Sequence, residues 1–235
     1  MHHLAEIDNI SITGNSVIHN LKAVSKMIFA LFILISIVVS DSIVHIGGIM
    51  LILIGILVFS RIPLKTVGVL VLYPAFFSLV FALIMMQQSF EHGLIVIFKA
   101  VGAALNMILL ITTTSYVDIF RVLSLFLPKL LVDIFLFTYR ALFIFIDQIE
   151  NLIKSMRLRG GYRAFNIFAN LKNVAGAIGV MVIHSIDMSN RMYQIFSLRG
   201  YSGGIINWHE DKKFKLLDFL YVLISIIILA GVIVF

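Results

Sequence analysis

The sequence predicts an all-α polytopic membrane protein with five transmembrane helices and a coupling-helix domain, cytoplasmic or interfacial, between the fourth and the fifth. Of the 235 residues, 61% are hydrophobic and 13% are charged, whereas a soluble domain is about 45–50% apolar and about 25% charged. Uncharged runs long enough to cross a bilayer as helices also recur along the chain. These observations exclude a soluble globular fold, and the lack of cysteine excludes disulfides and thiolate chemistry.

Because the hydrocarbon core of a bilayer is about 30 Å thick, a helix needs roughly 20 mostly apolar residues to cross it. The predicted spans are Met27–Ser40, extended by the apolar residues before it, Ile43–Phe59, Thr66–Met86, Leu94–Ile111 and Leu216–Phe235. Residues 1–117 therefore hold four spans, residues 118–212 form the coupling-helix domain, and residues 213–235 hold the final span. Pro74 should kink the third span, since it removes a backbone donor.

The basic residues predict the orientation of these spans. With the N-terminus in the cytoplasm, seventeen of the eighteen Lys and Arg residues fall on the cytoplasmic side, where the loops of membrane proteins carry such an excess. The exception, Lys99, lies near the outer end of the fourth span, where a long side chain can reach the interface. We therefore expect a multi-pass protein of the cell membrane with its N-terminus inside and its C-terminus outside. The net charge of +6 reflects this topology and does not indicate nucleic-acid binding.

Two alternatives to five spans stay open at this stage. Leu130–Ile146 is apolar enough to be a sixth span, but ten basic residues between Lys154 and Lys215 would then lie outside. The charge rule opposes that arrangement, although it weakens for loops longer than about 60 residues. If Val174–Ile186 also crossed, the chain would have seven spans. Five are favoured, with Leu130–Ile146 either crossing or lying in the interface.

Residues between the fourth and fifth spans carry charges at helical spacing. One narrow stripe consists of Arg140, Asp147, Glu150, Lys154 and Arg157. A second polar stripe consists of Asp187, Asn190, Arg191 and Gln194. Each pattern predicts an amphipathic helix with its apolar face toward the membrane interface and its charges toward the cytoplasm. The alternative for the first helix is a tilted span with a charged cytoplasmic extension.

Both amphipathic helices end in the same triplet. Leu158-Arg159-Gly160 recurs forty positions later as Leu198-Arg199-Gly200. Glycine after the last helical turn favours a left-handed C-cap, and arginine there complements the helix dipole. Two copies are hard to explain by capping alone, because an exposed guanidinium also suits an acidic partner surface. The triplets are therefore candidate contacts to partner subunits.

At these residues the sequence resembles the transmembrane (T) component of energy-coupling factor (ECF) transporters, importers of vitamins and transition-metal ions. The paired ends are similar to the two Ala-Arg-Gly signatures of that family, with leucine in place of alanine here. The stretch from Arg191 to Tyr201 is the most specific part of the match. Tyr139-Arg140 and the region from Thr112 to Pro128 are also similar, and the entry from His19 to Lys26 resembles the cobalt and nickel branch.

The resemblance implies a scaffold rather than an enzyme. Its helix ends at Leu158-Arg159-Gly160 and Leu198-Arg199-Gly200 would dock on two ATP-binding-cassette (ABC) ATPase subunits, and its apolar helices would hold a small substrate-binding membrane (S) subunit. The substrate would be cobalt or nickel, or a vitamin in the alternative branch. The chain has no G-x-x-x-x-G-K-[ST] phosphate loop, so ATP hydrolysis is expected in its partners.

No other constellation predicts a cofactor or a catalytic group. His2 and His3 lie near Glu6 and Asp8, but adjacent histidines near a terminus make a poor chelate, so we expect no metal site. A self-sufficient secondary carrier or a membrane enzyme is the competing class. A carrier should show inverted repeats or broken helices with polar residues at the midplane, and the sequence shows neither.

Overall fold

The computed structural model describes residues 8, 10–14, 16–60, 62–87, 89–161, 167–201, 203 and 216–234. The regular elements within these residues are α-helices. Contacts divide the chain into two compact units, one of residues 2–122 with 210–235 and one of residues 123–209. We call the first the core unit and the second the hairpin unit.

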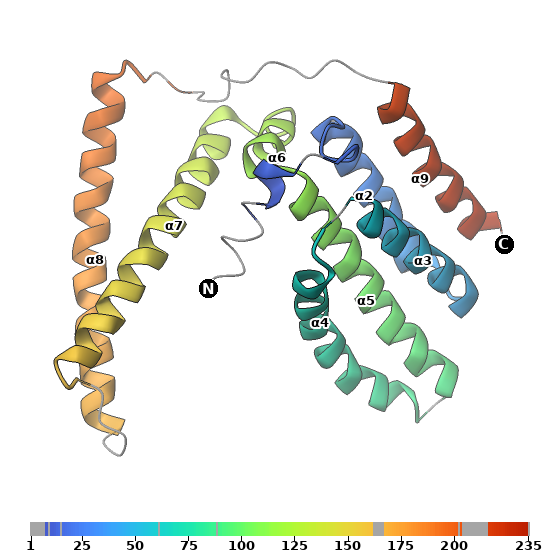
Figure 1. Cartoon of the computed structure of the whole chain (residues 1–235), viewed down its shortest axis with the longest axis horizontal. Coiled ribbons are helices and arrows are strands. Elements are labelled where there is room, and N and C mark those ends of the chain that lie inside the picture. The colour runs from blue at the N-terminus through green and yellow to red at the C-terminus, as the bar shows by residue number, and fades with distance from the viewer. Residues whose placement is uncertain are drawn as a thin grey trace. The chain divides into compact units, whose positions relative to one another are not determined.

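The core unit contains most of the helices. They are α2 (Ala23–Val39), α3 (Ile43–Phe59), α4 (Leu64–Met85), α5 (Phe90–Thr113), α6 (Tyr116–Leu123) and α9 (Leu216–Val234). Helix α5 packs against α2, α3 and α4, and α2 also packs against α9. In Figure 1, α4 folds back beside α5, so these consecutive helices form a hairpin within the unit.

The hydrophobic core of the chain lies in the core unit, where α2, α3 and α5 meet. Its fully buried side chains include Phe29, Ile33, Ile37, Leu53 and Leu57. Phe29 also stacks on Tyr221 of α9, with ring centroids 4.1 Å apart. These contacts fix α9 beside α2 although nearly the whole chain separates the two helices in sequence.

The hairpin unit contains α7 (Lys129–Leu158) and α8 (Ile167–Leu198). The two long helices contact each other and lie antiparallel, as the ribbon in Figure 1 shows. They are the two amphipathic helices that the charge spacing predicts. Helix α7 runs for 30 residues and α8 for 32, so both are continuous well beyond the predicted polar stripes.

Among the described residues, four helices are long and apolar enough to cross a membrane: Thr66–Met85, Phe90–Thr113, Asn170–Leu198 and Leu216–Val234. Three of them match predicted spans. The first two predicted spans are apolar helices of 17 residues each, and α4 runs unbroken through Pro74. Helix α7, which contains Leu130–Ile146, is not one of these four helices. Helix α8 is one of them and is the least apolar of the four.

The protein is therefore an all-helical membrane protein with several spans. Helix α8 is far longer than the thirteen-residue apolar run Val174–Ile186 that it contains. The count of five spans and the division at residues 117 and 212 remain predictions, since length and apolar composition alone do not decide which helices cross.

Candidate functional site

The two Leu-Arg-Gly triplets end α7 and α8 with the same backbone geometry. Gly160 and Gly200 each have φ of 69°, in the left-handed region that L-residues with a side chain rarely adopt. Gly161 donates its backbone N–H to the Met156 carbonyl at 2.9 Å, and Tyr201 donates to the Phe196 carbonyl at 3.0 Å. A second bond runs from each glycine N–H to the carbonyl three residues back, at 3.1 Å in both helices. Both ends are thus Schellman caps, as the glycines predict.

The cap places the leucine and the arginine of each triplet on the outside of the hairpin unit. Leu158 is 88% exposed and Leu198 is 89% exposed, and Arg159 and Arg199 are exposed as well. A leucine so exposed is costly in water unless a partner covers it, because its apolar surface remains hydrated. The hairpin unit therefore presents two equivalent ends, each with an apolar side chain beside a guanidinium.

The predicted charged stripes lie along the same two helices. Arg140, Asp147, Lys154 and Arg157 are exposed and Glu150 is half-buried on α7, and Asp187 and Arg191 are exposed on α8. Lys154 contacts Glu150 at 4.0 Å, one helical turn away. An exposed pair of this kind contributes at most about 0.5 kcal/mol, so the stripe serves solvation or recognition more than stability.

The core unit holds a polar cluster whose connectivity the sequence analysis missed. The side chain of Lys26 is buried and donates to the backbone carbonyls of Thr113 at 2.6 Å and His19 at 3.3 Å. The His19 ring contacts the Thr112 carbonyl at 3.1 Å through Nε2 and the Ser16 hydroxyl at 2.6 Å through Nδ1. The C-terminal carbonyls of α5 are thus covered by a lysine and a histidine, in keeping with the negative end of the helix dipole.

Asp218, from the other end of the sequence, bonds to the start of α2. Its carboxylate is buried and accepts the backbone N–H of Lys22, the N-cap residue of α2, at 2.8 Å. An anion there complements the positive end of α2. Asp218 is the third residue of the predicted final span Leu216–Phe235, and the structure buries it in the first turn of α9. Its position two residues inside the apolar run is the signal in the sequence that could have indicated a role.

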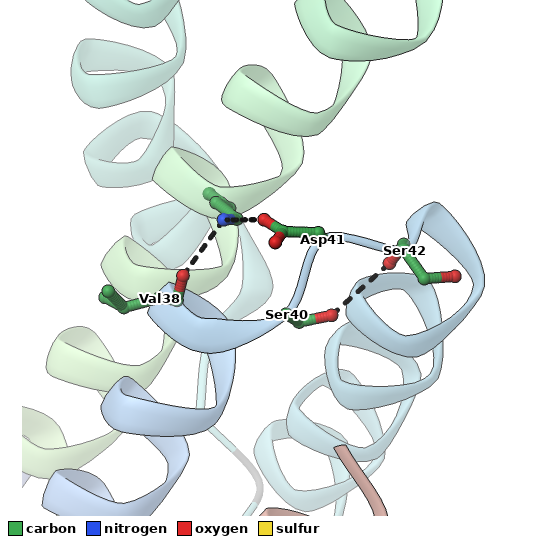
Figure 2. Close-up of polar contacts among 5 residues, drawn as sticks. Val38, Ser40, Asp41 and Ser42 are labelled. Carbon is green, nitrogen blue, oxygen red and sulfur yellow. Dashed lines mark hydrogen bonds and ion pairs between the residues drawn. The ribbon is translucent and has the colours of Figure 1, made fainter. Parts of the chain in front are cut away.

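At the opposite end of α2, Lys99 closes the connection to α3. Its ammonium donates to the Val38 carbonyl at 2.9 Å and contacts Asp41 at 3.3 Å; Figure 2 shows the dashed contacts that reach these two residues. Lys99 therefore bonds to the end of a neighbouring helix, in addition to any reach toward the interface. The contact places Lys99 at the level of the α2–α3 connection, and its location on the outer side of the membrane stays a prediction.

The part of the chain that the structure describes contains no group of three or more His, Asp or Glu residues able to hold a metal ion. His2, His3 and Glu6 lie outside the described residues. Asp8 is described, but it belongs to no such group.

Comparison with known proteins identifies the group to which these helices belong. No curated protein matches the chain. The family model described as CbiQ, cobalt transport protein, matches residues 14–210. The matched range contains the polar cluster around Lys26 and both Leu-Arg-Gly ends. Since the match covers most of the sequence, the chain belongs to the CbiQ family, the membrane components of ECF-type cobalt transporters.

Proposed function

We propose that this chain is the coupling subunit of an ATP-driven ECF importer for cobalt or nickel ions. Two ABC ATPase subunits would dock on the ends of α7 and α8, and a small S subunit would bind the substrate in the membrane. The observation that carries this proposal is the pair of identical caps, each presenting an exposed leucine beside an exposed arginine. Two equivalent ends suit two copies, or two related copies, of one ATPase.

The chemistry of each end specifies what it would bind. A guanidinium makes bidentate bonds to a carboxylate, which a lysine ammonium cannot reproduce. A leucine that is almost fully exposed gains roughly 1.5–3 kcal/mol on entering an apolar pocket. Each end therefore fits an apolar groove with a carboxylate at its edge. In this arrangement the chain transmits movement and hydrolyses no ATP itself, which agrees with its lack of a phosphate loop.

The proposal includes an orientation. The N-terminus and the hairpin unit would face the cytoplasm, where the ATPases are, and the C-terminus would lie outside. The distribution of basic residues supports this orientation, because Lys99 is then the one basic residue of the sequence on the outer side. The lipid bilayer and the S subunit would cover the exposed apolar faces of the core unit.

Substitution of the two arginines tests the proposal. We expect the Arg159→Ala, Arg199→Ala double variant to insert normally yet to copurify poorly with the ATPases and to lose at least tenfold in ATP-dependent cobalt uptake. Arg159→Lys and Arg199→Lys keep the charge and the dipole interaction but remove the planar fork, so they should be intermediate. Lys172→Ala is the matched control, since Lys172 is an exposed basic residue in the second turn of α8 that belongs to neither triplet.

Two further readouts separate recognition from capping. Gly160→Ala and Gly200→Ala strain the cap and leave the guanidinium, so they should weaken binding less than the arginine variants do. The size of the arginine effect reports burial in the complex: removing one partner of a buried pair costs about 3–5 kcal/mol, and of an exposed pair at most about 1 kcal/mol. Normal assembly and uptake by the double alanine variant, or ATP turnover by the purified chain alone, would refute the proposal.

A further inference from the structure

Each Leu-Arg-Gly end is bonded to the other helix of the hairpin unit. At the end of α7, the Gly161 carbonyl accepts a hydrogen bond from the Asn173 side chain of α8 at 2.7 Å. At the end of α8, the Tyr201 hydroxyl donates to the carboxylate of Asp133 on α7. Gly161 and Tyr201 occupy equivalent positions, because each is the second residue after its arginine. Each also donates the bond of its Schellman cap that reaches five residues back.

The two bonds differ in strength and setting. Asn173 is exposed and provides one neutral amide donor. Asp133 is 1% exposed, and a bond to a carboxylate is roughly twice as strong as one between neutral groups. The Tyr201 ring also lies against Phe196 and Phe137, with centroids 5.7 and 6.0 Å away, and these two phenylalanines are 4.7 Å apart. The Arg199 end is thus held by a bond to a carboxylate and by three rings, whereas the bond that the structure describes at the Arg159 end is a neutral amide bond.

The position of Asp133 gives this asymmetry a consequence. Asp133 lies in the second turn of α7, close in sequence to α6 and the end of α5. Tyr201 lies two positions after Arg199 and bonds to Asp133. A force applied at Arg199 can therefore reach the start of α7 through this bond, without passing back along all 32 residues of α8. At the Arg159 end, the described bond from Asn173 is exposed and leads instead to the start of α8.

We propose that Tyr201 and Asp133 are positioning residues that fix the Arg199 end to the start of α7, so that the two coupling ends act unequally. The Arg199 end moves together with α7, and the Arg159 end adjusts to its partner. This inference rests on the proposed function for its role in transport. The contact between Tyr201 and Asp133, which we call the latch, is by contrast a property of the chain alone.

The first experiment measures the latch in the isolated full-length chain. The sequence contains no cysteine, so spin labels can be attached uniquely at Ile134→Cys and Ile195→Cys, two exposed positions on either side of the contact. We expect a narrow distribution of label separations by electron paramagnetic resonance, and a clearly broader one after Tyr201→Phe. Tyr193→Phe, at an exposed tyrosine of α8, should leave the distribution narrow. An unchanged distribution in Tyr201→Phe overturns the inference.

The second experiment measures coupling in the assembled transporter. We expect Tyr201→Phe and Asp133→Ala to raise the ATP hydrolysed per cobalt ion taken up by at least threefold, with unchanged subunit composition. Because both variants break the same contact, the double variant should be no worse than either single variant, as a double-mutant cycle requires. Asn173→Ala should change this ratio less than twofold. Additive effects, or an equal effect of Asn173→Ala, would contradict unequal ends.

The two experiments separate the inference from the proposed function. If the arginine double variant assembles and transports normally, the coupling role fails whether or not the labels report a latch. If the arginines are required but Tyr201→Phe leaves the label separations and the ATP ratio unchanged, the latch fails and the coupling role stands.

Discussion

The core unit and the hairpin unit both place charged side chains at helix ends, but in opposite settings. In the core unit, Lys26 and Asp218 are buried, and their charged groups bond to backbone at the ends of α5 and α2. In the hairpin unit, Arg159 and Arg199 stand exposed beside the caps of α7 and α8. The same electrostatic preference thus serves internal cohesion in one unit and, under the proposed function, presentation to a partner in the other.

Packing shows the same difference. Helix α2 is buried against α3, α5 and α9 along its length, whereas the apolar stretch of α8 is not buried anywhere within the chain. Burial of apolar area dominates folding stability. The core unit therefore has its own hydrophobic core, whereas the described residues of the hairpin unit are held by the caps and by the contacts at its two ends.

The largest test of this comparison is topology, because its outcome is all or none. Single cysteines can be introduced at Asp41, Lys172 and Ser197 without removing any native cysteine. In intact cells, a membrane-impermeant thiol reagent should label Asp41→Cys only, since the five-span arrangement places both ends of α8 inside. Permeabilised cells should label all three positions, which is the control for access.

Each alternative arrangement gives its own labelling pattern. Labelling of both Lys172→Cys and Ser197→Cys from outside indicates that α7 crosses alone. Labelling of Lys172→Cys but not Ser197→Cys indicates that α7 and α8 both cross, and the reverse indicates that α8 crosses alone. Any of these results removes the distinction between a membrane unit and a cytoplasmic hairpin, and with it the proposed docking of both helix ends on ATPases.

The second test compares a buried and an exposed lysine. Lys26→Met keeps most of the side-chain volume but leaves the carbonyls of Thr113 and His19 without the lysine donor. We expect a loss of about 3 kcal/mol in the free energy of unfolding, since buried groups deprived of a charged partner cost this much. Lys154→Met, at an exposed residue of α7, should cost about 0.5 kcal/mol or less.

Far-UV circular dichroism of the purified chain in detergent, followed against denaturant, measures both lysine variants. Equal losses would mean that the Lys26 contacts contribute no more than a surface ion pair. The exposed arginines of the two triplets should behave in the opposite way. Their removal should leave the free energy of unfolding unchanged but should reduce uptake. The comparison then separates residues that hold the core unit together from residues that act on a partner.

The sequence predicted the helical class, most element positions and both capped ends, because these depend on local signals. Apolar runs mark α3, α4, α5 and α9, and Leu-Arg-Gly marks the ends of α7 and α8. It did not predict that Asp218 meets Lys22 or that Tyr201 meets Asp133. These pairs join residues far apart in sequence, and no periodicity within one helix indicates which side chain of another helix lies opposite.

The smallest expected effect compares two glycines of the hairpin unit, each with open space around its Cα. A methyl group added at Gly160 or Gly176 would meet no heavy atom within 4 Å, so contacts with neighbours do not distinguish the two positions. Backbone conformation does. Gly160 has φ of 69°, where an alanine costs about 1–2 kcal/mol. Gly176 lies within α8, where alanine is favoured by about 0.5–1 kcal/mol.

The same substitution should therefore have opposite signs at the two positions. Gly160→Ala should speed amide hydrogen exchange in the last turn of α7, and Gly176→Ala should slow it in the middle of α8, because local opening reports local stability. Measuring the purified chain and the assembled transporter sharpens the result. If Gly176→Ala is stabilising in the chain alone but destabilising in the complex, a neighbouring helix must approach that face of α8 closely, as small residues permit. A destabilising effect already in the isolated chain would contradict the open surface that α8 presents here.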